Sequence, residues 1–295
     1  MTRGDIFNIC KILLLALVSW TLPPRLWRAV AVATSIAGRD DQSGDAYRDN
    51  LGASPSQAAA ISRRRRAYTR ELNLQIVGLT GPWRAWRPHT RLIGAEYLRT
   101  ALDTGHGAIL WMTETSFGTL VAKMILADAG IRAVQLSRPQ HGFSTTEFGM
   151  RYLNPIWTAV EDRFIAERVA INGQYATDAL TVLRARLATN HVIIVAVAPQ
   201  AHRLALMPFL QSRLPMPTGP IRLARETGAA LLPAFTLAND SGGFELSIHA
   251  PLSPGVAEID DESIALAYVR QLESFALNHP DQWTGWHWLT PQAPV

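Results

Sequence analysis

The strand that decides the fold is Val192-Ile193-Ile194-Val195-Ala196-Val197, a continuous apolar run that Pro199 closes. Most of its residues are β-branched, and such side chains pack well on the pleated surface of a sheet. A strand that is buried on both faces shows an unbroken apolar run, because neither face meets water. The run therefore predicts a central strand of a parallel sheet covered on both sides.

Shorter apolar runs on both sides of this strand predict further strands at residues 108–112, 133–136, 231–237 and 244–249. Apolar residues at helical spacing predict helices at residues 117–129, 155–170, 179–187, 221–227 and 260–277. This alternation indicates an α/β fold with a mainly parallel central sheet flanked by helices. Sites in such folds lie beyond the carboxyl ends of strands, here after Met112, Leu136 and Val197.

The N-terminus carries an apolar run at residues 12–18, which the prolines at 23 and 24 separate from a weaker apolar stretch at residues 26–36. The first run has about half of the roughly 20 apolar residues that a spanning helix needs. Trp20 and Trp27, with arginines beside them, are typical of the membrane interface. We therefore expect two short helices that anchor the chain in one leaflet. A full transmembrane helix and a cleaved signal peptide are the alternatives.

Basic residues are concentrated near this segment. The first 100 residues hold 15 of the 28 Lys and Arg and 7 of the 24 Asp and Glu, and the remainder is net acidic. The run Arg63-Arg64-Arg65-Arg66 is either a solvated helix face or a contact with anionic lipid. No nucleic-acid recognition module follows it, so nucleic acid is not an expected partner.

The pattern divides the chain into three parts. These are an N-terminal membrane-associated segment at residues 1–37, a polar linker with an Arg-rich helix at residues 38–70, and an α/β domain at residues 71–295. The single cysteine, Cys10, excludes an internal disulfide framework and a Cys-rich zinc site. The eight His are scattered along the chain, so no metal is expected. Walker, Gly-x-Gly-x-x-Gly, His-Glu-x-x-His and Gly-x-Ser-x-Gly motifs are absent from the sequence.

Two stretches near the C-terminus carry a resemblance to a known family. They are residues 219–233, GPIRLARETGAALLP, and the ending Pro280-Asp281-Gln282-Trp283 with Trp286, His287 and Trp288. Both are similar to the bacterial lipid A biosynthesis acyltransferases of the lysophospholipid acyltransferase superfamily, and the resemblance extends over about residues 10–290.

The resemblance implies a transferase on the cytoplasmic face of the bacterial inner membrane. Such an enzyme moves a fatty acyl group from a thioester of acyl carrier protein or coenzyme A to the hydroxyl of a membrane lipid or glycolipid. The thioester is a co-substrate, and no further cofactor is implied. The family places a His-x-x-x-x-Asp/Glu motif after the first core strand, where the His takes the proton of the acceptor.

The chain departs from the family at this motif. The matching positions hold Glu114 and Thr119, so neither family catalytic residue is present. Two interpretations are left open. The preferred one is an acyltransferase with a rearranged site, and the other is a catalytically inactive relative that binds lipid or a partner.

The leading candidate for a relocated base is His141, in the loop after the second core strand, with Glu147 as the carboxylate that orients its ring. Glu114 becomes a second candidate base if burial raises its pKa. Each of these residues also has an interpretation without a catalytic role. His141 can be an ordinary loop histidine, and Glu114 can be a solvated carboxylate. Glu147 can form a capping box with Ser144 at the start of a helix.

The candidates for substrate binding are Thr119, Arg138, Arg168 and Arg222. An arginine at such a site binds the phosphate of an acyl carrier or of a lipid headgroup. The acceptor groove is expected between the loops at residues 113–119 and 138–147, because loops that follow parallel strands converge on one edge of the sheet.

Overall fold

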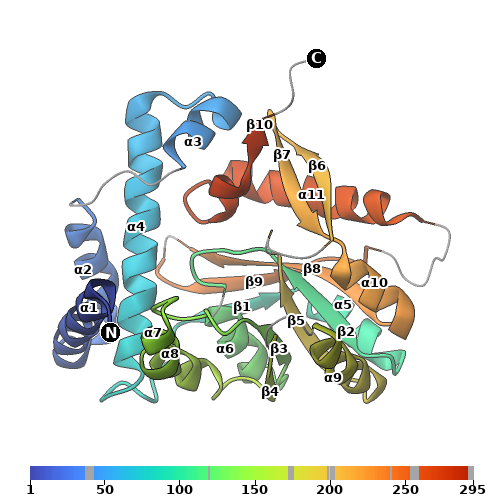
Figure 1. The fold of residues 1–295 in the computed structure, drawn as a ribbon, viewed down its shortest axis with the longest axis horizontal. Coiled ribbons are helices and arrows are strands. Elements are labelled where there is room, and N and C mark those ends of the chain that lie inside the picture. The colour runs from blue at the N-terminus through green and yellow to red at the C-terminus, as the bar shows by residue number, and fades with distance from the viewer. Residues whose placement is uncertain are drawn as a thin grey trace.

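A seven-stranded sheet forms the centre of the molecule in the computed structural model, which describes residues 1–36, 43–118, 120–171, 176–197, 199, 203–239, 241–252 and 259–291 (Figure 1). The strand order is β1-β9-β8-β2-β5-β3-β4. The bounds are β1 Thr90–Ile93, β2 Ala108–Met112, β3 Val134–Ser137, β4 Glu167–Ala170, β5 Val192–Ala196, β8 Ala230–Ala238 and β9 Phe244–Ile248. Every neighbouring pair is parallel except β8 with β9, so the predicted mainly parallel sheet is confirmed.

Helices pack on both faces of this sheet. Their bounds are α5 Ala95–Asp103, α6 Val121–Asp128, α7 Glu147–Tyr152, α8 Asn154–Glu161, α9 Ala176–Ala188, α10 Gly219–Thr227 and α11 Asp261–Asn278. Alternate residues of β2 enter different cores: Ile109 and Trp111 pack with α9, α10 and α11, and Leu110 packs with α5, α6 and α8. Because the central strands are buried on both faces, their sequences are unbroken apolar runs.

Two predicted helices differ from the observed elements. The helix expected at residues 155–170 ends at Glu161, and the last four of those residues form β4. The chain turns where the amide of Phe164 donates to the carbonyl of Glu161, and the amide of Ala166 then joins the carbonyl of Ala133. In residues 167–170, hydrogen bonds to the edge of β3 therefore replace the hydrogen bonds that a longer helix would make. The helix expected from residue 117 begins at Val121, because residues 115–118 make a turn that the C-terminal segment holds.

The sequence also left a second sheet unpredicted. It consists of β6 Leu204–Phe209, β7 Ser212–Pro217 and β10 Thr290–Pro291 in the antiparallel order β10-β7-β6. Prolines at 208, 215 and 217 make this stretch unlike a strand, because proline donates no ladder hydrogen bond.

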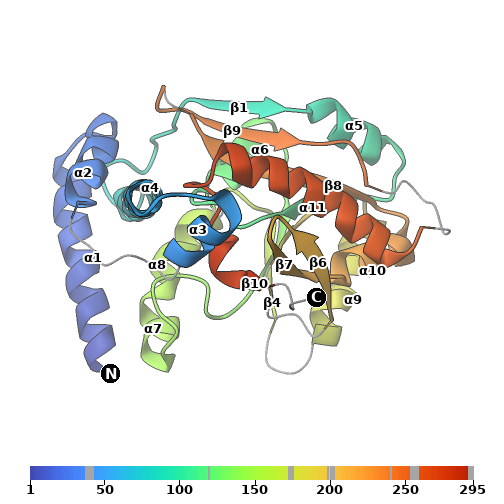
Figure 2. The same cartoon turned by 90° about the horizontal axis from the view of Figure 1, so that it is seen from above.

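The N-terminal part is helical: α1 Arg3–Thr21, the short helix η1 Pro24–Leu26, α2 Trp27–Thr34, α3 Gly44–Leu51 and α4 Pro55–Gly78. The prolines separate α1 from α2, as predicted, but α1 has 19 residues and is longer than the short helix expected. Both lie on the outer side of the long helix α4 in Figures 1 and 2. Of the expected linker, residues 38–42 lie outside the described residues, and α3 is packed, with Tyr47 fully buried against Trp286.

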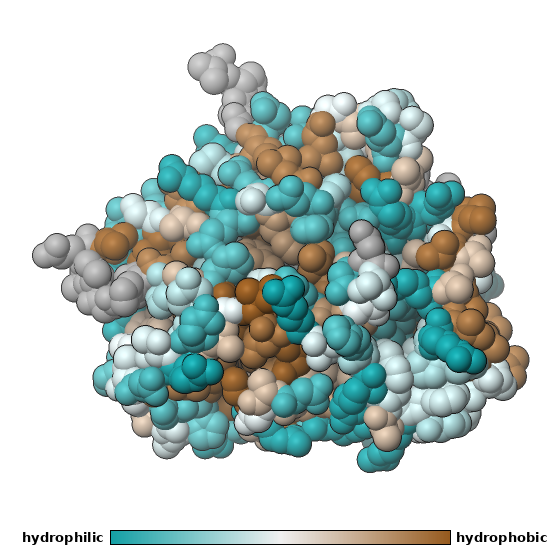
Figure 3. Space-filling view, turned by 180° about the vertical axis from the view of Figure 1, so that it is seen from behind, coloured by the Kyte–Doolittle hydropathy of each residue, from teal (hydrophilic) through white to brown (hydrophobic). Residues whose placement is uncertain are grey.

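The outward face of α1 and α2 is apolar. Large hydrophobic side chains are exposed along it, among them Phe7, Leu13, Leu14, Leu17 and Val32, each with more than half of its surface accessible. Figure 3 shows brown, apolar residues at the edge of the molecule that these helices form. Among the helices that the structure describes, α1 is the one long and apolar enough to cross a membrane.

Candidate functional site

The loops that follow β2 and β3 leave the sheet at the same edge, with β5 lying between the two strands. Glu114 follows β2 and Arg138 follows β3. The two side chains are close enough for the charge of Arg138 to act on the Glu114 carboxyl. The juxtaposition of these loops, inferred from the sequence, is therefore present in the fold.

Glu114 is the carboxyl group with a strongly raised pKa at this edge. Burial raises the pKa of Glu114 to about 7 from its ordinary value of 4.5, and the positive charge of Arg138 offsets only part of that rise. Its backbone carbonyl accepts hydrogen bonds from the amide and the hydroxyl of Thr284, at 3.1 and 2.9 Å. The loop is thus held in place. Near neutral pH, both the protonated and the ionised form of the Glu114 carboxyl are populated.

The C-terminal segment holds this loop in place. Trp283 Nε1 donates to Thr113 Oγ1 at 2.9 Å, and the amide of Ser116 donates to the carbonyl of Gln282 at 3.0 Å. The Gln282 side chain in turn bonds both the amide and the carbonyl of Ala238, at 2.7 and 2.8 Å, at the end of β8. The ending singled out in the sequence therefore ties the loop after β2 to the end of a neighbouring strand.

A histidine–carboxylate pair lies beyond β3. His141 Nε2 is 2.9 Å from Glu161 Oε2, at the C-terminal end of α8. The Glu161 side chain is fully buried, whereas 24% of the His141 side chain is accessible to solvent. The imidazole also packs edge to face on Trp157, with ring centroids 5.9 Å apart. The ring is therefore fixed on one side and open to solvent on the other.

Glu161 is the centre of a buried charge cluster. Its Oε2 also contacts Lys123 Nζ at 2.7 Å and Arg168 Nη2 at 2.9 Å, and its Oε1 accepts from Trp157 Nε1 at 2.8 Å. Burial alone would raise the pKa of Glu161, but the charges of Lys123, His141 and Arg168 hold it well below its usual range. Because the carboxylate is then ionised, it accepts the hydrogen bond and His141 Nε2 is the donor. In the neutral form of the imidazole the other ring nitrogen, Nδ1, is then an acceptor.

The loop that carries His141 is clamped by the buried side chain of Asn154, the first residue of α8. Asn154 Oδ1 accepts from the amide of Ser144 at 2.9 Å, and Nδ2 donates to the carbonyls of Ser144 at 2.9 Å and Pro139 at 3.3 Å. A side chain at Gly142 would collide with Asn154, since a Cβ there would lie 2.6 Å from it. One helix thus supplies the clamp at Asn154, the packing surface at Trp157 and the carboxylate at Glu161.

The profile of the bacterial lipid A biosynthesis acyltransferases matches residues 80–292. The chain belongs to the bacterial lipid A biosynthesis acyltransferase family. The match includes both loops of the candidate site, the histidine–carboxylate pair and the C-terminal ending. The chain therefore has an acyltransferase-like function, with acyl-donor and lipid acceptor substrates in general. No curated protein matches the chain.

The remaining candidates for this family member lie in different places. Glu147 is exposed at the start of α7, and the cap of that helix is Thr146, whose Oγ1 accepts from the amide of Gly149 at 3.0 Å. The contact to His141 that was expected of Glu147 is made by Glu161 instead. Thr119 lies outside the described residues.

The two other arginine candidates are engaged in ion pairs. Arg168 is bound inside the cluster by Glu161 and by Asp162 at 2.7 Å. Arg222, on α10, is exposed and pairs with Glu226 at 2.6 Å. Figures 1 and 2 both place α10 at the opposite end of the molecule from α7 and α8. The structure therefore brings Arg168 to His141 and leaves Arg222 apart.

Sequence analysis missed Glu161 and Lys123. A signal for Lys123 was present, because a lysine inside the apolar run Leu-Val-Ala-Lys-Met-Ile-Leu requires a buried partner. Glu161 follows Trp157 by four residues and so lies on the face of the helix that enters the core. Among the described residues, no group of three or more His, Cys, Asp or Glu side chains could hold a metal ion.

The raised pKa of Glu114 predicts a pH-dependent stability difference. In the unfolded chain the carboxyl ionises near 4.5, but in the folded protein only near 7, so folding becomes less favourable as pH rises between these values. Glu114→Gln should match the wild type below about pH 4.5 and be more stable by up to about 3 kcal/mol at pH 8. Urea unfolding at both pH values measures this. The exposed control Glu147→Gln should shift stability by about 0.5 kcal/mol or less.

Proposed function

We propose that the protein transfers a fatty acyl group from a carrier thioester to a hydroxyl of a lipid or glycolipid, with His141 as the general base. The observation that carries this proposal is the pair of His141 and the buried Glu161, 2.9 Å apart, in a chain of this family. His141 takes the role of the family's histidine as proton acceptor, and Glu161 takes the role of the family's carboxylate, although both lie at other positions in the sequence. The carboxylate fixes the tautomer and orientation of the ring.

The reaction follows from the free nitrogen of His141. Nδ1 takes the proton of the acceptor hydroxyl as its oxygen attacks the thioester carbonyl, which forms the ester C–O bond. The C–S bond then breaks, and the proton passes from His141 to the leaving thiolate. Lys123 and Arg168 balance the charges of Glu161 and Asp162, so this set of four groups is neutral before the imidazole takes up a proton.

Arg138 and Glu114 are proposed to serve the donor side of the site. Arg138 places a positive charge at the edge of the sheet where both loops meet, which suits a phosphate group of acyl carrier protein or coenzyme A. Glu114, with its pKa of about 7, is the second group able to exchange a proton near neutral pH. It is the alternative base if His141 proves dispensable.

The reaction is proposed to take place at the cytoplasmic face of the inner membrane, with α1 and α2 as the anchor. Their exposed apolar side chains support an interfacial or spanning position. The arginine run contributes less to membrane binding than its charge suggests. Arg64 pairs with Asp281 at 2.6 Å, Arg65 bonds Ser43, and Arg66 reaches the carbonyl of Ser35, so these residues hold helices together.

The anchor predicts the behaviour of a triple variant in which Leu13, Leu14 and Leu17 become glutamine. These side chains are 62–64% exposed, so their replacement should leave the fold intact while moving the protein from the membrane to the soluble fraction. Fractionation of cells, followed by immunoblotting, measures the distribution. Leu204→Gln with Leu206→Gln, on the exposed face of β6, is the matched control. Equal membrane binding of wild type and triple variant would contradict the anchor.

The proposed reaction is tested with the purified full chain in lipid vesicles. Radiolabelled palmitoyl thioesters of acyl carrier protein and of coenzyme A are supplied as donors, and the lipids are separated afterwards. We expect label in a lipid as an ester that mild alkali releases. No transfer from either donor above the rate without protein, with neutral and phosphorylated glycolipids both present, would refute the proposed function.

A further inference from the structure

Tryptophan and arginine are interleaved in the segment that joins α4 to β1, Trp83-Arg84-Ala85-Trp86-Arg87. The segment lies directly against the C-terminal end of α1. Trp20 Nε1 donates to the carbonyl of Val77 at 3.0 Å, and a Cβ at Gly81 would lie 2.5 Å from the same nitrogen. The two tryptophans of the segment pack against the hydrophobic cluster that α1, α2 and α4 form. Its arginines are therefore fixed beside one end of the proposed anchor.

These arginines lie together with Arg163, which precedes β4. Arg163 Nη1 donates to the carbonyl of Leu79 at 3.1 Å, and Nη2 donates to the carbonyl of Arg84. The guanidinium groups of Arg87 and Arg163 lie 4.7 and 5.4 Å from the centre of the Phe164 ring. Backbone acceptors and one aromatic ring thus hold three arginines in one place, and we call Arg84, Arg87 and Arg163 the arginine patch.

The arginine patch has little compensating negative charge. Among the described residues, the one ion pair of the patch joins Arg87 Nε to Asp128 Oδ1, at 3.8 Å. Arg132 lies beside the patch and donates to the carbonyl of Arg163 at 2.8 Å, so four positive charges face one carboxylate. Burial, and after it the charges of Arg84 and Arg87, lowers the pKa of Arg163. Guanidinium groups held this close favour an anionic ligand with several oxygen atoms, such as a phosphate.

The arginine patch lies at the opposite edge of the central sheet from the candidate site. Arg132 and Arg163 precede the parallel strands β3 and β4, whereas Glu114 and His141 follow β2 and β3. A carrier protein on the patch would therefore dock away from the loops where the reaction is proposed. This placement favours the bilayer over acyl carrier protein as the anionic partner.

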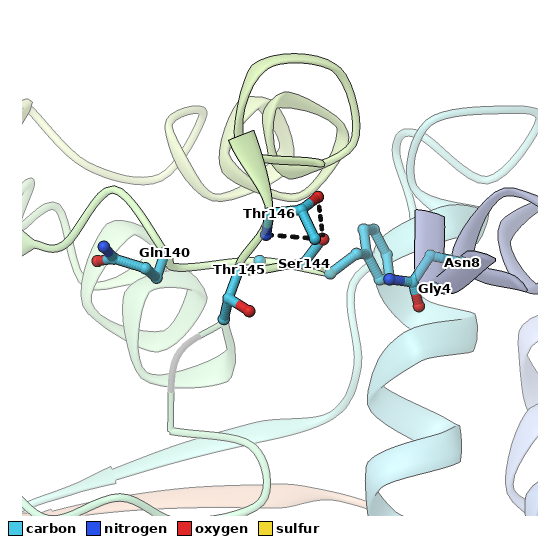
Figure 4. A pocket seen from close by; sticks show the side chains of 8 residues that line it. Gly4, Asn8, Gln140, Ser144, Thr145 and Thr146 are labelled. Carbon is cyan, nitrogen blue, oxygen red and sulfur yellow. Dashed lines mark hydrogen bonds between the residues drawn. The ribbon is translucent and has the colours of Figure 1, made fainter. Parts of the chain in front are cut away.

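The helix α1 connects these two edges. Figure 4 shows Gly4 and Asn8, near the N-terminal end of α1, beside the loop that follows His141, and the hydroxyl of Thr146 in that loop donates to the carboxylate of Asp5. The 19 residues of α1 extend over about 28 Å, at 1.5 Å per residue. A bilayer on the apolar outward face of α1 would therefore have the His141 loop near one end of the contact and the arginine patch near the other.

We propose that the arginine patch binds the phosphate groups of anionic phospholipids at the bilayer surface. The patch offers guanidinium groups for phosphate oxygens, and Trp20, which is 45% exposed, marks the adjoining end of α1 as interfacial. The arginines at residues 64–66 do not provide this contact, because they hold helices together. The inference rests on the proposed anchor and is independent of acyl transfer. In this arrangement α1 supplies affinity for any bilayer, and the patch supplies the preference for anionic lipid.

The test measures sedimentation of the purified full chain with vesicles of phosphatidylcholine, without and with about 30% phosphatidylglycerol. We expect the chain to bind both kinds of vesicle, and the anionic vesicles at least 30-fold more tightly at low salt, because each arginine near an anionic surface contributes roughly fivefold. Arg84→Gln with Arg87→Gln should reduce this preference by about 10- to 25-fold. In about 0.5 M salt the preference of the wild type should largely disappear, because screening weakens exposed charges.

The matched control is Arg99→Gln with Arg213→Gln, which removes the same charge at exposed positions on α5 and β7, away from α1 in Figures 1 and 2. It should keep the wild-type preference. Equal binding of the wild type to neutral and anionic vesicles would overturn the site, and so would an equal preference in the two double variants.

Two further outcomes are distinguishable from these. If Arg84→Gln with Arg87→Gln loses binding to acyl carrier protein and keeps its preference for anionic vesicles, the patch belongs to the carrier and the lipid assignment is wrong. Absence of binding to either kind of vesicle would refute the anchor and the lipid site together. None of these results depends on acyl transfer, which is measured separately.

Discussion

His141→Ala is expected to lower the rate of acyl transfer by about 10²- to 10⁴-fold, the usual contribution of a general base. The position of the imidazole is fixed by a buried carboxylate, through a 2.9 Å contact with Glu161. Without it the acceptor hydroxyl must lose its proton to water, and the barrier rises by roughly 3–5.5 kcal/mol. Because the base acts only in the transition state, kcat should fall while KM changes little.

The measurement is the initial rate of labelled acyl transfer as a function of acceptor concentration and pH. His106→Ala, which removes an exposed histidine before β2, is the matched control and should retain the wild-type rate. Glu161→Gln should also lower kcat, because the ring loses the carboxylate that fixes its tautomer. An unchanged rate in His141→Ala, combined with a rate about 10²-fold lower in Glu114→Gln, would transfer the role of base to Glu114.

A secondary-structure element can be predicted from the sequence when its own residues carry the pattern, and not when it depends on contacts with distant residues. Apolar runs such as residues 192–197 predict strands because burial on both faces leaves a pattern in the run itself. The edge strand β4 was taken for helix, because helical spacing up to Phe164 did not reveal that the next residues pair with β3. The ribbon of β6 and β7 was missed because its prolines obscure any strand pattern.

The same limit applies to the site. The edge of the sheet and His141 follow from the position of the loops after the predicted strands, and Glu114 follows from its alignment with the family motif, so they could be named in advance. The partner of His141 could not, because Glu161 reaches it from a separate helix 20 residues later, whereas Glu147 is only six residues away and exposed. Arg168 was chosen for its charge, but its burial beside Glu161 gives it a structural contact that no local pattern indicates.

The largest expected effect on stability comes from removing the charge of Glu161. Glu161→Gln should lower the free energy of unfolding by about 3–5 kcal/mol at neutral pH, because the buried Lys123 would lose its carboxylate partner, whereas Arg168 would keep Asp162. The side chains of Lys123 and Glu161 are only 2% and 0% exposed, so water cannot replace the lost partner. By contrast, Glu226→Gln, which breaks the pairs with Arg184 and Arg222 at the protein surface, should cost about 1 kcal/mol or less.

The stabilisation that Glu161 provides should depend on pH. The pKa of Glu161 lies well below its ordinary value of 4.5, so its stabilisation is fully present above that value and is lost as pH falls through the acid range. The difference between wild type and Glu161→Gln should therefore be constant near neutral pH and shrink below about pH 4.5. Urea unfolding of both proteins from pH 7 to pH 3 measures it.

A double-mutant cycle decides whether the charges or the packing carry the stability. Lys123→Met keeps the volume of the side chain and removes its charge, so the pair Lys123→Met with Glu161→Gln leaves one fewer buried cation than Glu161→Gln alone. The double variant should recover part of the loss, with a coupling energy of about 1–3 kcal/mol. A loss in the double variant equal to the sum of the two single losses would show that the two residues do not interact. In that case the stability would come from the packing and the other contacts of each side chain, and not from the ion pair between Lys123 and Glu161.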